Sequence, residues 1–223
     1  RDELRRPTRR LGRAIGFVEW NTAGIASGAA RRTERPHAVA RATLEHVERV
    51  LSDHLRTSAP GSRFQVSLRL YGGWHAGTTT TPHLHGVTRM RETYGSRVRK
   101  YHGGHVAFLG GREGIRVGAK LACVPGRLPR KHDFHLLDTL RRRNGEQSEK
   151  MVDTALVVDL LGLATRREAD LYLVVSDDDD MLPGVLAAEA VGASVGMLSR
   201  PDRSSRFMAH AADLVFTYES VGP

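Results

Sequence analysis

The chain has 223 residues, which is enough to bury a hydrophobic core without disulfides or a structural metal. Its one cysteine, Cys123, excludes a disulfide framework and a zinc site built on cysteines, and a lone thiol is typical of a reducing, cytoplasmic compartment. The 34 basic residues exceed the 25 acidic ones, and the formal net charge of +9 favours an anionic partner, above all a phosphate backbone. No uncharged apolar run reaches the roughly 18 residues of a membrane span, so we expect no membrane partner.

The first third of the chain begins with a basic arm over residues 1–13, which lacks the apolar core of a secretory signal. The apolar run Ala14–Trp20 predicts a buried strand, and the small residues of Asn21–Ala30 predict a loop. Apolar residues recur at helical spacing over Arg35–Arg56, which predicts an amphipathic helix. Phe64–Trp74 predicts a second strand.

The middle of the chain is less regular. A helix is expected around Thr81–Tyr94, and Ile115–Val124 alternates as a strand does. The basic segment Pro125–Gln147 has little periodicity and is interpreted as a loop.

The last third alternates helices and strands clearly, and its first helix begins at a capping serine, Ser148. The expected elements are a helix over Ser148–Asp170, a strand over Leu171–Ser176, a loop and helix over Asp177–Gly192, a strand over Ala193–Leu198, a helix over Arg203–Ala212 and a strand over Asp213–Tyr218. This alternation predicts an α/β fold of three α/β/α layers around a mostly parallel sheet. Because no linker interrupts residues 14–223, we expect them to form a single domain.

Acidic residues stand where strands of such a sheet end. Glu19 lies at the end of the first predicted strand, and Asp178 and Asp180 follow the strand Leu171–Ser176. Asp153 lies in the first turn of the helix that precedes that strand. Since sites in parallel sheets form beyond the carboxyl ends of strands, these acids are candidates for a Mg²⁺ or Mn²⁺ site acting on a phosphodiester.

Each acid also has a structural interpretation. The run of aspartates after the strand is equally typical of a solvated loop that caps the next helix. Asp153 alone is a favourable charge near a helix N-terminus. Glu19 is harder to explain this way, because a carboxylate in an apolar strand is costly unless it is paired or binds a metal. Asp159 does not share the helix face of Asp153 and is interpreted as structural.

The segment from Glu149 to Pro183 resembles the NYN domain family, a branch of the PIN-like nucleases. The family's Lys-x-x-Asp helix start is matched by Lys150 and Asp153. Its motif Ser-Gly-Asp-Ser-Asp-Phe-x-Pro is matched in register at Ser176, Asp178, Asp180 and Pro183. Asp177, Asp179 and Met181 replace the family's Gly, Ser and Phe. The resemblance covers the last third well and the first strand moderately.

The first strand departs from the family pattern in two places. Glu19 stands where the family has an aspartate, and its extra methylene moves the carboxylate by about 1.5 Å. Asn21 follows after two residues rather than the more usual three.

The resemblance implies a PIN-like (Rossmann-like) fold and a metal-dependent endoribonuclease that hydrolyses single-stranded or looped RNA. The implied ligands of Mg²⁺ or Mn²⁺, which are also the catalytic residues, are Glu19, Asp153, Asp178 and Asp180. Asn21 and Ser176 are expected to hydrogen-bond a ligand carboxylate or the scissile phosphate, and Lys150 to bind substrate.

Substrate binding is expected to come from basic residues in the loop before the Asp153 helix. These residues are Arg127, Arg130, Lys131, Arg141, Arg142 and Arg143. Solvated loop charges are the alternative interpretation. Two other classes remain open: a catalytically degenerate nucleic-acid-binding or regulatory module on the same fold, and a small-molecule phosphohydrolase. Homo-oligomer formation is also left open.

Overall fold

The computed structural model describes residues 11–119, 121, 136, 138–143, 146–203 and 205–218. The elements in the first half are β1 (Leu11–Glu19), α1 (Trp20–Ala26), α2 (Ala29–Arg32), α3 (Pro36–Ser58), β2 (Arg63–Tyr71), β3 (His75–Ala76), β4 (Thr79–Thr80), α4 (Pro82–Tyr94), β5 (Arg99–Tyr101), η1 (His102–Gly104), β6 (Val106–Phe108), α5 (Gly111–Gly114) and β7 (Ile115–Val117). They are followed by β8 (Leu140–Arg143), β9 (Glu146–Glu149), α6 (Val152–Thr165), β10 (Leu171–Val175), η3 (Asp179–Met181), α7 (Leu182–Ala190), β11 (Val195–Ser199), η4 (Pro201–Arg203), α8 (Arg206–His210) and β12 (Val215–Thr217).

Strand β1 lies at the centre of an eight-stranded sheet with the order β12-β11-β10-β1-β2-β6-β5, in which β7 also pairs with β2. It runs parallel to β10 on one side and to β2 on the other. Among the described pairings of this sheet, only β5 with β6 is antiparallel. The predicted α/β class with a mostly parallel sheet is therefore confirmed.

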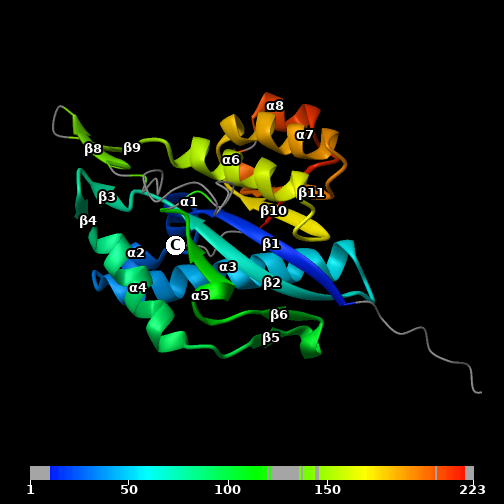
Figure 1. The fold of residues 1–223 in the computed structure, drawn as a ribbon, viewed down its shortest axis with the longest axis horizontal. Helices are drawn as coiled ribbons and strands as arrows, with labels where there is room; N and C mark the ends of the chain where they lie inside the picture. Colours follow the sequence, from blue (N-terminus) through cyan, green and yellow to red (C-terminus); the bar gives the residue numbers. More distant parts are fainter. Residues whose placement is uncertain are drawn as a thin grey trace, which may run out of the picture.

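Helices cover both faces of the sheet (Figure 1). Helix α3 packs on one face, and α6 and α7 pack on the other. Alternate residues of β1 divide between these layers, because successive side chains of a strand point to opposite faces. Val18 belongs to the α3 layer, and Phe17 belongs to the α6 layer.

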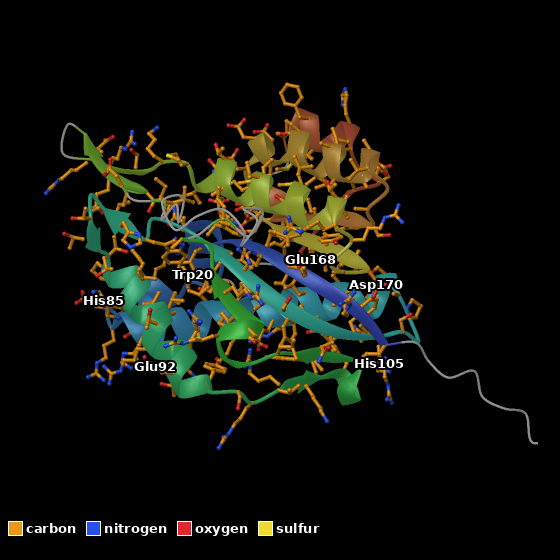
Figure 2. The ribbon with its side chains drawn as sticks, viewed as in Figure 1. Trp20, His85, Glu92, His105, Glu168 and Asp170 are labelled. Carbon is orange, nitrogen blue, oxygen red and sulfur yellow. The ribbon has the colours of Figure 1, made fainter. Side chains whose placement is uncertain are left out.

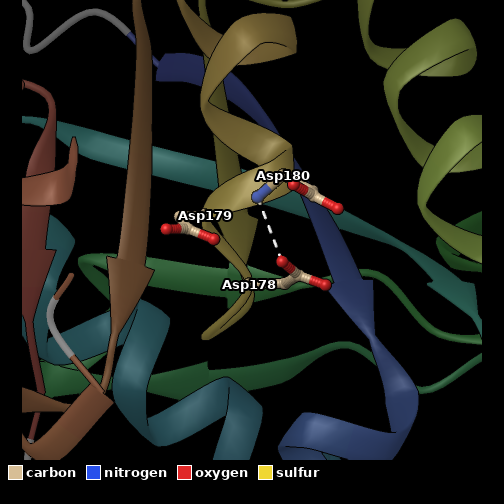
Figure 3. Close-up of side chains that lie close together, drawn as sticks. All are labelled: Asp178, Asp179 and Asp180. Atoms are coloured by element: carbon tan, nitrogen blue, oxygen red, sulfur yellow. Dashed lines mark hydrogen bonds between the residues drawn. The ribbon is translucent and has the colours of Figure 1, made fainter.

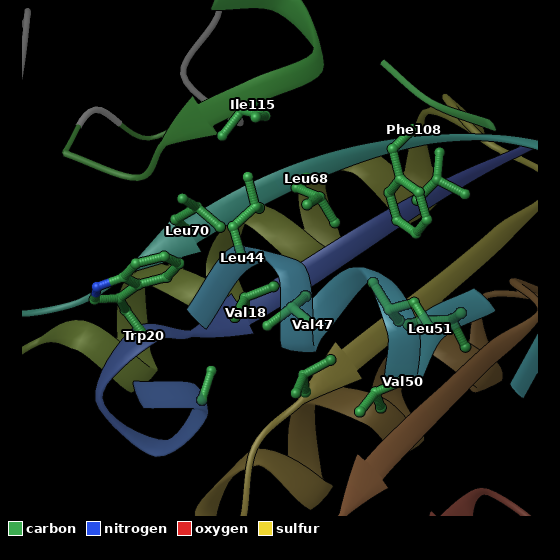
Figure 4. Close-up of a cluster of buried hydrophobic side chains, with 14 of the residues drawn as sticks. Val18, Trp20, Leu44, Val47, Val50, Leu51, Leu68, Leu70, Phe108 and Ile115 are labelled. Carbon is green, nitrogen blue, oxygen red and sulfur yellow. The ribbon is translucent and has the colours of Figure 1, made fainter. Parts of the chain in front are cut away.

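Helix α3 has the amphipathic character that its apolar spacing predicts. Leu44, Val47 and Leu51 recur on one helical face, are fully buried, and pack against Leu68 and Leu70 of β2 (Figure 4). Truncating a leucine in such a core typically costs about 2–5 kcal/mol of stability.

A buried ion pair joins the sheet to α6. Arg69 Nη2 of β2 donates to Asp159 Oδ2 at 2.8 Å, and the Tyr71 hydroxyl donates to the same oxygen at 2.7 Å. Arg69 and Asp159 are 5% and 0% exposed. Asp159 therefore has the structural position that its helix face predicts.

The loop predicted over Asn21–Ala30 is wrong. Trp20–Ala26 forms α1, and a second short helix starts at Ala29. Ala23 and Ala26 are buried in the core that α3 shares. Here the small residues allow the helices to pack closely together. In the sequence alone, the same residues are typical of a flexible loop.

The helix predicted from Ser148 starts later. Residues Glu146–Glu149 form β9, which pairs antiparallel with β8, so part of the loop predicted over Pro125–Gln147 is a hairpin. Met151 adopts a left-handed conformation (φ 63°), and α6 begins at Val152. The helix also ends at Thr165 rather than Asp170.

The strand predicted over Ile115–Val124 is wrong beyond Val117, where β7 ends and residues 118–119 form a turn; residues 120 and 122–124 lie outside the described part of the chain. The other predicted helices and strands are close to those observed, with shorter ends. Leu11–Arg13 belong to β1 rather than to the basic arm, and residues 1–10 lie outside the described part of the chain. In the ranges that the structure describes, every helix is too short or too polar to cross a membrane.

Candidate functional site

The acidic residues singled out in the sequence gather at the carboxyl ends of the central strands. Glu19 is the last residue of β1, and Asp178 follows β10 after two residues. The two strands are paired in parallel with Val18 opposite Val175, so both ends lie at one edge of the sheet. Asp153 reaches this edge from the first turn of α6.

Ser176 links the two strand ends. Its hydroxyl donates to Glu19 Oε2 at 2.5 Å and accepts a hydrogen bond from the backbone amide of Asp178 at 3.0 Å. Ser176 is completely buried. One side chain thus fixes the Glu19 carboxylate and the start of the aspartate loop relative to each other.

Glu19 is a buried carboxylate, only 9% exposed. Burial raises its pKa, hydrogen bonds from Ser176 and Thr22 lower it, and the charges of Asp153 and Asp178 raise it. The net direction is upward, because burial and neighbouring carboxylates disfavour the charged form.

Asp153 faces the same group of acids. Burial raises its pKa, and the negative charges of Asp178 and Asp180 raise it further. Lys150, an exposed residue three positions before Asp153, acts in the opposite direction and lowers that pKa through its positive charge. The Lys-x-x-Asp pattern therefore places a cation at the rim of the acidic site.

The loop after β10 turns tightly and brings three carboxylates together (Figure 3). Asp178 Oδ1 accepts a hydrogen bond from the Asp180 amide at 3.0 Å. Carboxylate oxygens of Asp178, Asp179 and Asp180 all lie within 4.8 Å of one another. Capping of the following helical turn by Asp178 coexists with this clustering.

Glu149 is a further acid of the site that the sequence interpretation missed. It ends β9, and its Oε1 accepts a hydrogen bond from the Gly73 amide, just beyond β2, at 2.6 Å. Its pKa is raised to about 7: burial raises it most, the Gly73 hydrogen bond lowers it, and the charges of Glu19 and Asp153 raise it. No motif signalled Glu149, because its position depends on a hairpin in a segment without periodicity.

Asp177 does not face the other acids but pairs with Arg200. It accepts hydrogen bonds from the Arg200 amide at 2.9 Å and from Arg200 Nε at 2.6 Å. This partly buried ion pair joins the loop to the end of β11. Asp177 is therefore neutralised by a cation, whereas its neighbours face other carboxylates.

Asn21 does not occupy the expected position. It is exposed on α1, whereas Thr22, the next residue, is buried and hydrogen-bonded to Glu19. The short spacing after Glu19 explains the difference, because the helix begins at Trp20 (labelled in Figure 2) and turns Asn21 outward.

Only part of the expected basic surface falls within the described residues. Arg141 and Arg142 are exposed on β8, and Arg141 Nε donates to Asp138 Oδ2 at 2.8 Å. Arg143 belongs to the same strand, but its side chain lies outside the described residues. The positions of Arg127, Arg130 and Lys131 also lie outside them.

The donor set of this site suits a hard divalent cation. It consists of carboxylate oxygens from the ends of β1 and β9, the start of α6 and the loop after β10. Mg²⁺ and Mn²⁺ prefer such oxygen ligands. Burial and, to a smaller extent, the neighbouring carboxylates raise the pKa values of Glu19, Glu149 and Asp153, and the charge of a divalent cation offsets both effects. The chain as a whole matches no family model, no curated protein and no solved structure.

Proposed function

We propose that the chain is a metal-dependent endoribonuclease that hydrolyses phosphodiester bonds in single-stranded or looped RNA. The observation that carries the proposal is the convergence of Glu19, Asp153 and Asp178 on one edge of a parallel sheet, where the charges of Asp153 and Asp178 help to raise the pKa of Glu19. Structural acids are usually paired with cations, as Asp177 and Asp159 are, whereas Glu19, Asp153 and Asp178 form no ion pair with the residues that the structure describes.

A PIN-like identity for the fold belongs to the same proposal. In its support, the acids occur in the chain order of that family: one at the end of the first strand, one at a helix start, and a pair after the next strand. RNA as the substrate rests on the resemblance of Lys150, Asp153 and the segment from Ser176 to Pro183 to NYN domains.

Glu19, Asp153 and Asp178 would hold Mg²⁺ or Mn²⁺, with Asp180 and Glu149 at the rim. A bound divalent cation supplies charge neutralisation at phosphorus and lowers the pKa of a water molecule. Ser176 keeps the Glu19 carboxylate in place by donating to its Oε2. Lys150, exposed beside Asp153, is placed to attract the phosphate backbone.

The test is cleavage of a labelled single-stranded RNA in Mg²⁺, Mn²⁺ or EDTA, with wild type and Asp178→Asn side by side. Asparagine retains the Oδ1 acceptor that the Asp180 amide needs, so the loop is expected to keep its shape. Glu34→Gln removes an exposed carboxylate that is not among the charges acting on Glu19, Glu149 or Asp153, and it is the matched control.

We expect cleavage that requires the metal, falls at least about 100-fold in Asp178→Asn and is unchanged in Glu34→Gln. Cleavage by Asp178→Asn at the wild-type rate would contradict the proposal. Salt-sensitive RNA binding without cleavage in either protein would instead identify a catalytically degenerate binding module.

A further inference from the structure

A second cluster of charged side chains lies apart from the carboxylates and is basic. Arg69, Arg91, Arg112 and Arg116 line one cavity of about 430 Å³, together with apolar residues and a single acid, Glu168 (labelled in Figure 2). We call these four residues the arginine cradle. None of the carboxylates of the proposed metal site lines this cavity.

The floor of the arginine cradle is rigid. Arg69 is buried and held by Asp159 and Tyr71, so its guanidinium has a fixed position. Arg116 of β7 pairs in register with Arg69 of β2, and residues in register on adjacent strands point to the same face. Two guanidinium groups therefore stand side by side on the sheet.

Two further arginines come from helices at the side of the cavity. Arg91 lies on α4, and Arg112 lies on α5. Helix α5 begins at Gly111, directly after its N-cap residue Gly110. Arg91 Nε is buried and has no hydrogen-bond partner among the described residues. Burial lowers the pKa of Arg91, and the positive charge of Arg112 lowers it further.

The cradle holds more positive than negative charge: Glu168 is the acid that lines its cavity, and the charge of Glu92 acts on Arg91. Asp159 neutralises Arg69, but Arg91, Arg112 and Arg116 form no ion pair in the described part of the chain. Glu168 is already paired with Arg166 at 2.8 Å. Like charges held together without counter-ions destabilise a fold, so this arrangement favours an anionic ligand.

We propose that the arginine cradle binds a phosphate group. Phosphate matches the cradle because its oxygens accept several hydrogen bonds at once, and planar guanidinium forks bind them in pairs. The unpartnered Nε of Arg91 is one donor for such a ligand. The phosphate belongs either to the backbone of a polynucleotide or to a small phosphate compound.

A second cavity adjoins the first and helps to choose between a polynucleotide and a small phosphate compound as the source of the phosphate. This cavity of about 240 Å³ shares Arg69, Arg116 and Glu168 with the first and adds Arg13 and Glu113. Together the two adjacent cavities are lined by five arginines, as expected for a site that binds successive phosphates of a polynucleotide.

The experiment measures the thermal unfolding midpoint in EDTA as inorganic phosphate is increased at constant ionic strength. Because no divalent metal is present, the result does not depend on the proposed nuclease activity. Arg112→Ala and Arg116→Ala remove exposed members of the cradle from two different elements. Arg49→Ala removes an exposed arginine of α3 outside the cavity and is the control.

We expect phosphate to raise the midpoint of wild type and of Arg49→Ala, and its apparent affinity to fall at least about tenfold in both cradle variants. Without phosphate, Arg112→Ala should have a higher midpoint than wild type, because the repulsion on Arg91 is relieved. A purely structural arginine would give the opposite shift.

Two outcomes would overturn the proposal: a wild-type midpoint that does not respond to phosphate, or an equal response in the cradle variants. A single-stranded RNA oligonucleotide and a ribonucleoside monophosphate, added separately in EDTA, then distinguish the two sources. If Arg112→Ala and Arg116→Ala reduce the affinity for the oligonucleotide more than the affinity for the monophosphate, the site binds a polynucleotide backbone. If they reduce the affinity for the monophosphate more, the site binds a small phosphate compound.

Discussion

Ser176 Oγ lies 2.5 Å from Glu19 Oε2, although 157 residues separate them in the chain. The same hydroxyl accepts from the Asp178 amide. The hydrogen bond ties the end of β1 to the end of β10 and sets the separation between two proposed metal ligands. The longer reach of Glu19, compared with an aspartate, is what brings its carboxylate to this serine.

Removing the Ser176 hydroxyl should reduce cleavage activity strongly and the stability of the fold only moderately. Ser176→Ala leaves a buried carboxylate and a backbone amide without this partner, which we expect to cost about 1–3 kcal/mol of stability. Cleavage should fall about 10–100-fold, as when a group that orients a metal ligand is removed. Denaturant unfolding and cleavage rates measure the two effects.

Ser199→Ala is the control for this variant, because Ser199 is equally buried at the end of the neighbouring strand β11 but bonds to Asp177 instead. It should retain most of the cleavage activity. Equal losses in the two serine variants would argue against a specific positioning role for Ser176.

Shortening Glu19 should reduce activity rather than improve it. Glu19→Asp withdraws the carboxylate by about 1.5 Å, which breaks the hydrogen bond with Ser176. We expect cleavage to fall about 100-fold, close to the loss in Glu19→Gln. A Glu19→Asp protein that is more active than wild type would mean that Ser176 does not set the working geometry.

Glu149 should make the metal-free protein less stable as pH rises. Its pKa is raised from 4.5 to about 7 in the fold, so between these values the folded protein holds more protons than the unfolded chain. The free energy of unfolding therefore falls as pH increases through this range. Glu149 is partly exposed, and after allowance for solvent screening we expect a change on the order of 1 kcal/mol.

Glu149→Gln should flatten this pH dependence when unfolding is measured in EDTA between pH 4.5 and 8. Glutamine retains an oxygen that can accept from the Gly73 amide, so the hairpin's hydrogen bond is conserved. Identical pH profiles for the variant and the wild type would show that another group titrates in this range.

Breaking the ion pair between Arg69 and Asp159 should destabilise the whole fold. Asp159→Ala leaves the buried Arg69 guanidinium without its counter-ion, which typically costs about 3–5 kcal/mol. Replacing both residues with apolar ones, as in Arg69→Met with Asp159→Leu, should recover much of this loss. Equilibrium unfolding of the single and double variants tests the coupling.

The exposed arginines of β8 should contribute to RNA binding through charge. For each phosphate of a single strand that the protein no longer neutralises, the slope of log affinity against log salt concentration becomes shallower by about 0.7. Arg142→Glu should show this smaller slope, and Arg49→Glu, on α3, should not. An unchanged slope in Arg142→Glu would exclude this strand from the binding surface.

The helices and strands were predicted correctly from the sequence where their apolar residues recur at a regular spacing. The central strands and α3 are fully buried on at least one side, and their apolar spacing is unambiguous. Because parallel strands end at a common edge, the gathering of Glu19, Asp153 and Asp178 followed from the strand assignments.

The errors lie where pairing with another segment of the chain overrides the preference of the local composition. Ser148 has the properties of a helix cap, but pairing with Arg141 of β8 holds it in a strand. Glu149 then enters the site through Gly73, which is 76 residues away in the chain. Thr22, rather than Asn21, lies beside Glu19 because the helix begins one residue after Glu19.

The central position of β1 has a consequence for synthesis of the protein. As the chain leaves the ribosome, β2 follows β1 closely, but the other partner of β1, residues 171–175, is made about 150 residues later. At about 5–20 residues per second, this delay is roughly 8–30 s. During that time the backbone N–H and C=O groups along one edge of β1 are open to pairing with other chains, and Glu19 has neither Ser176 nor the aspartate loop beside it.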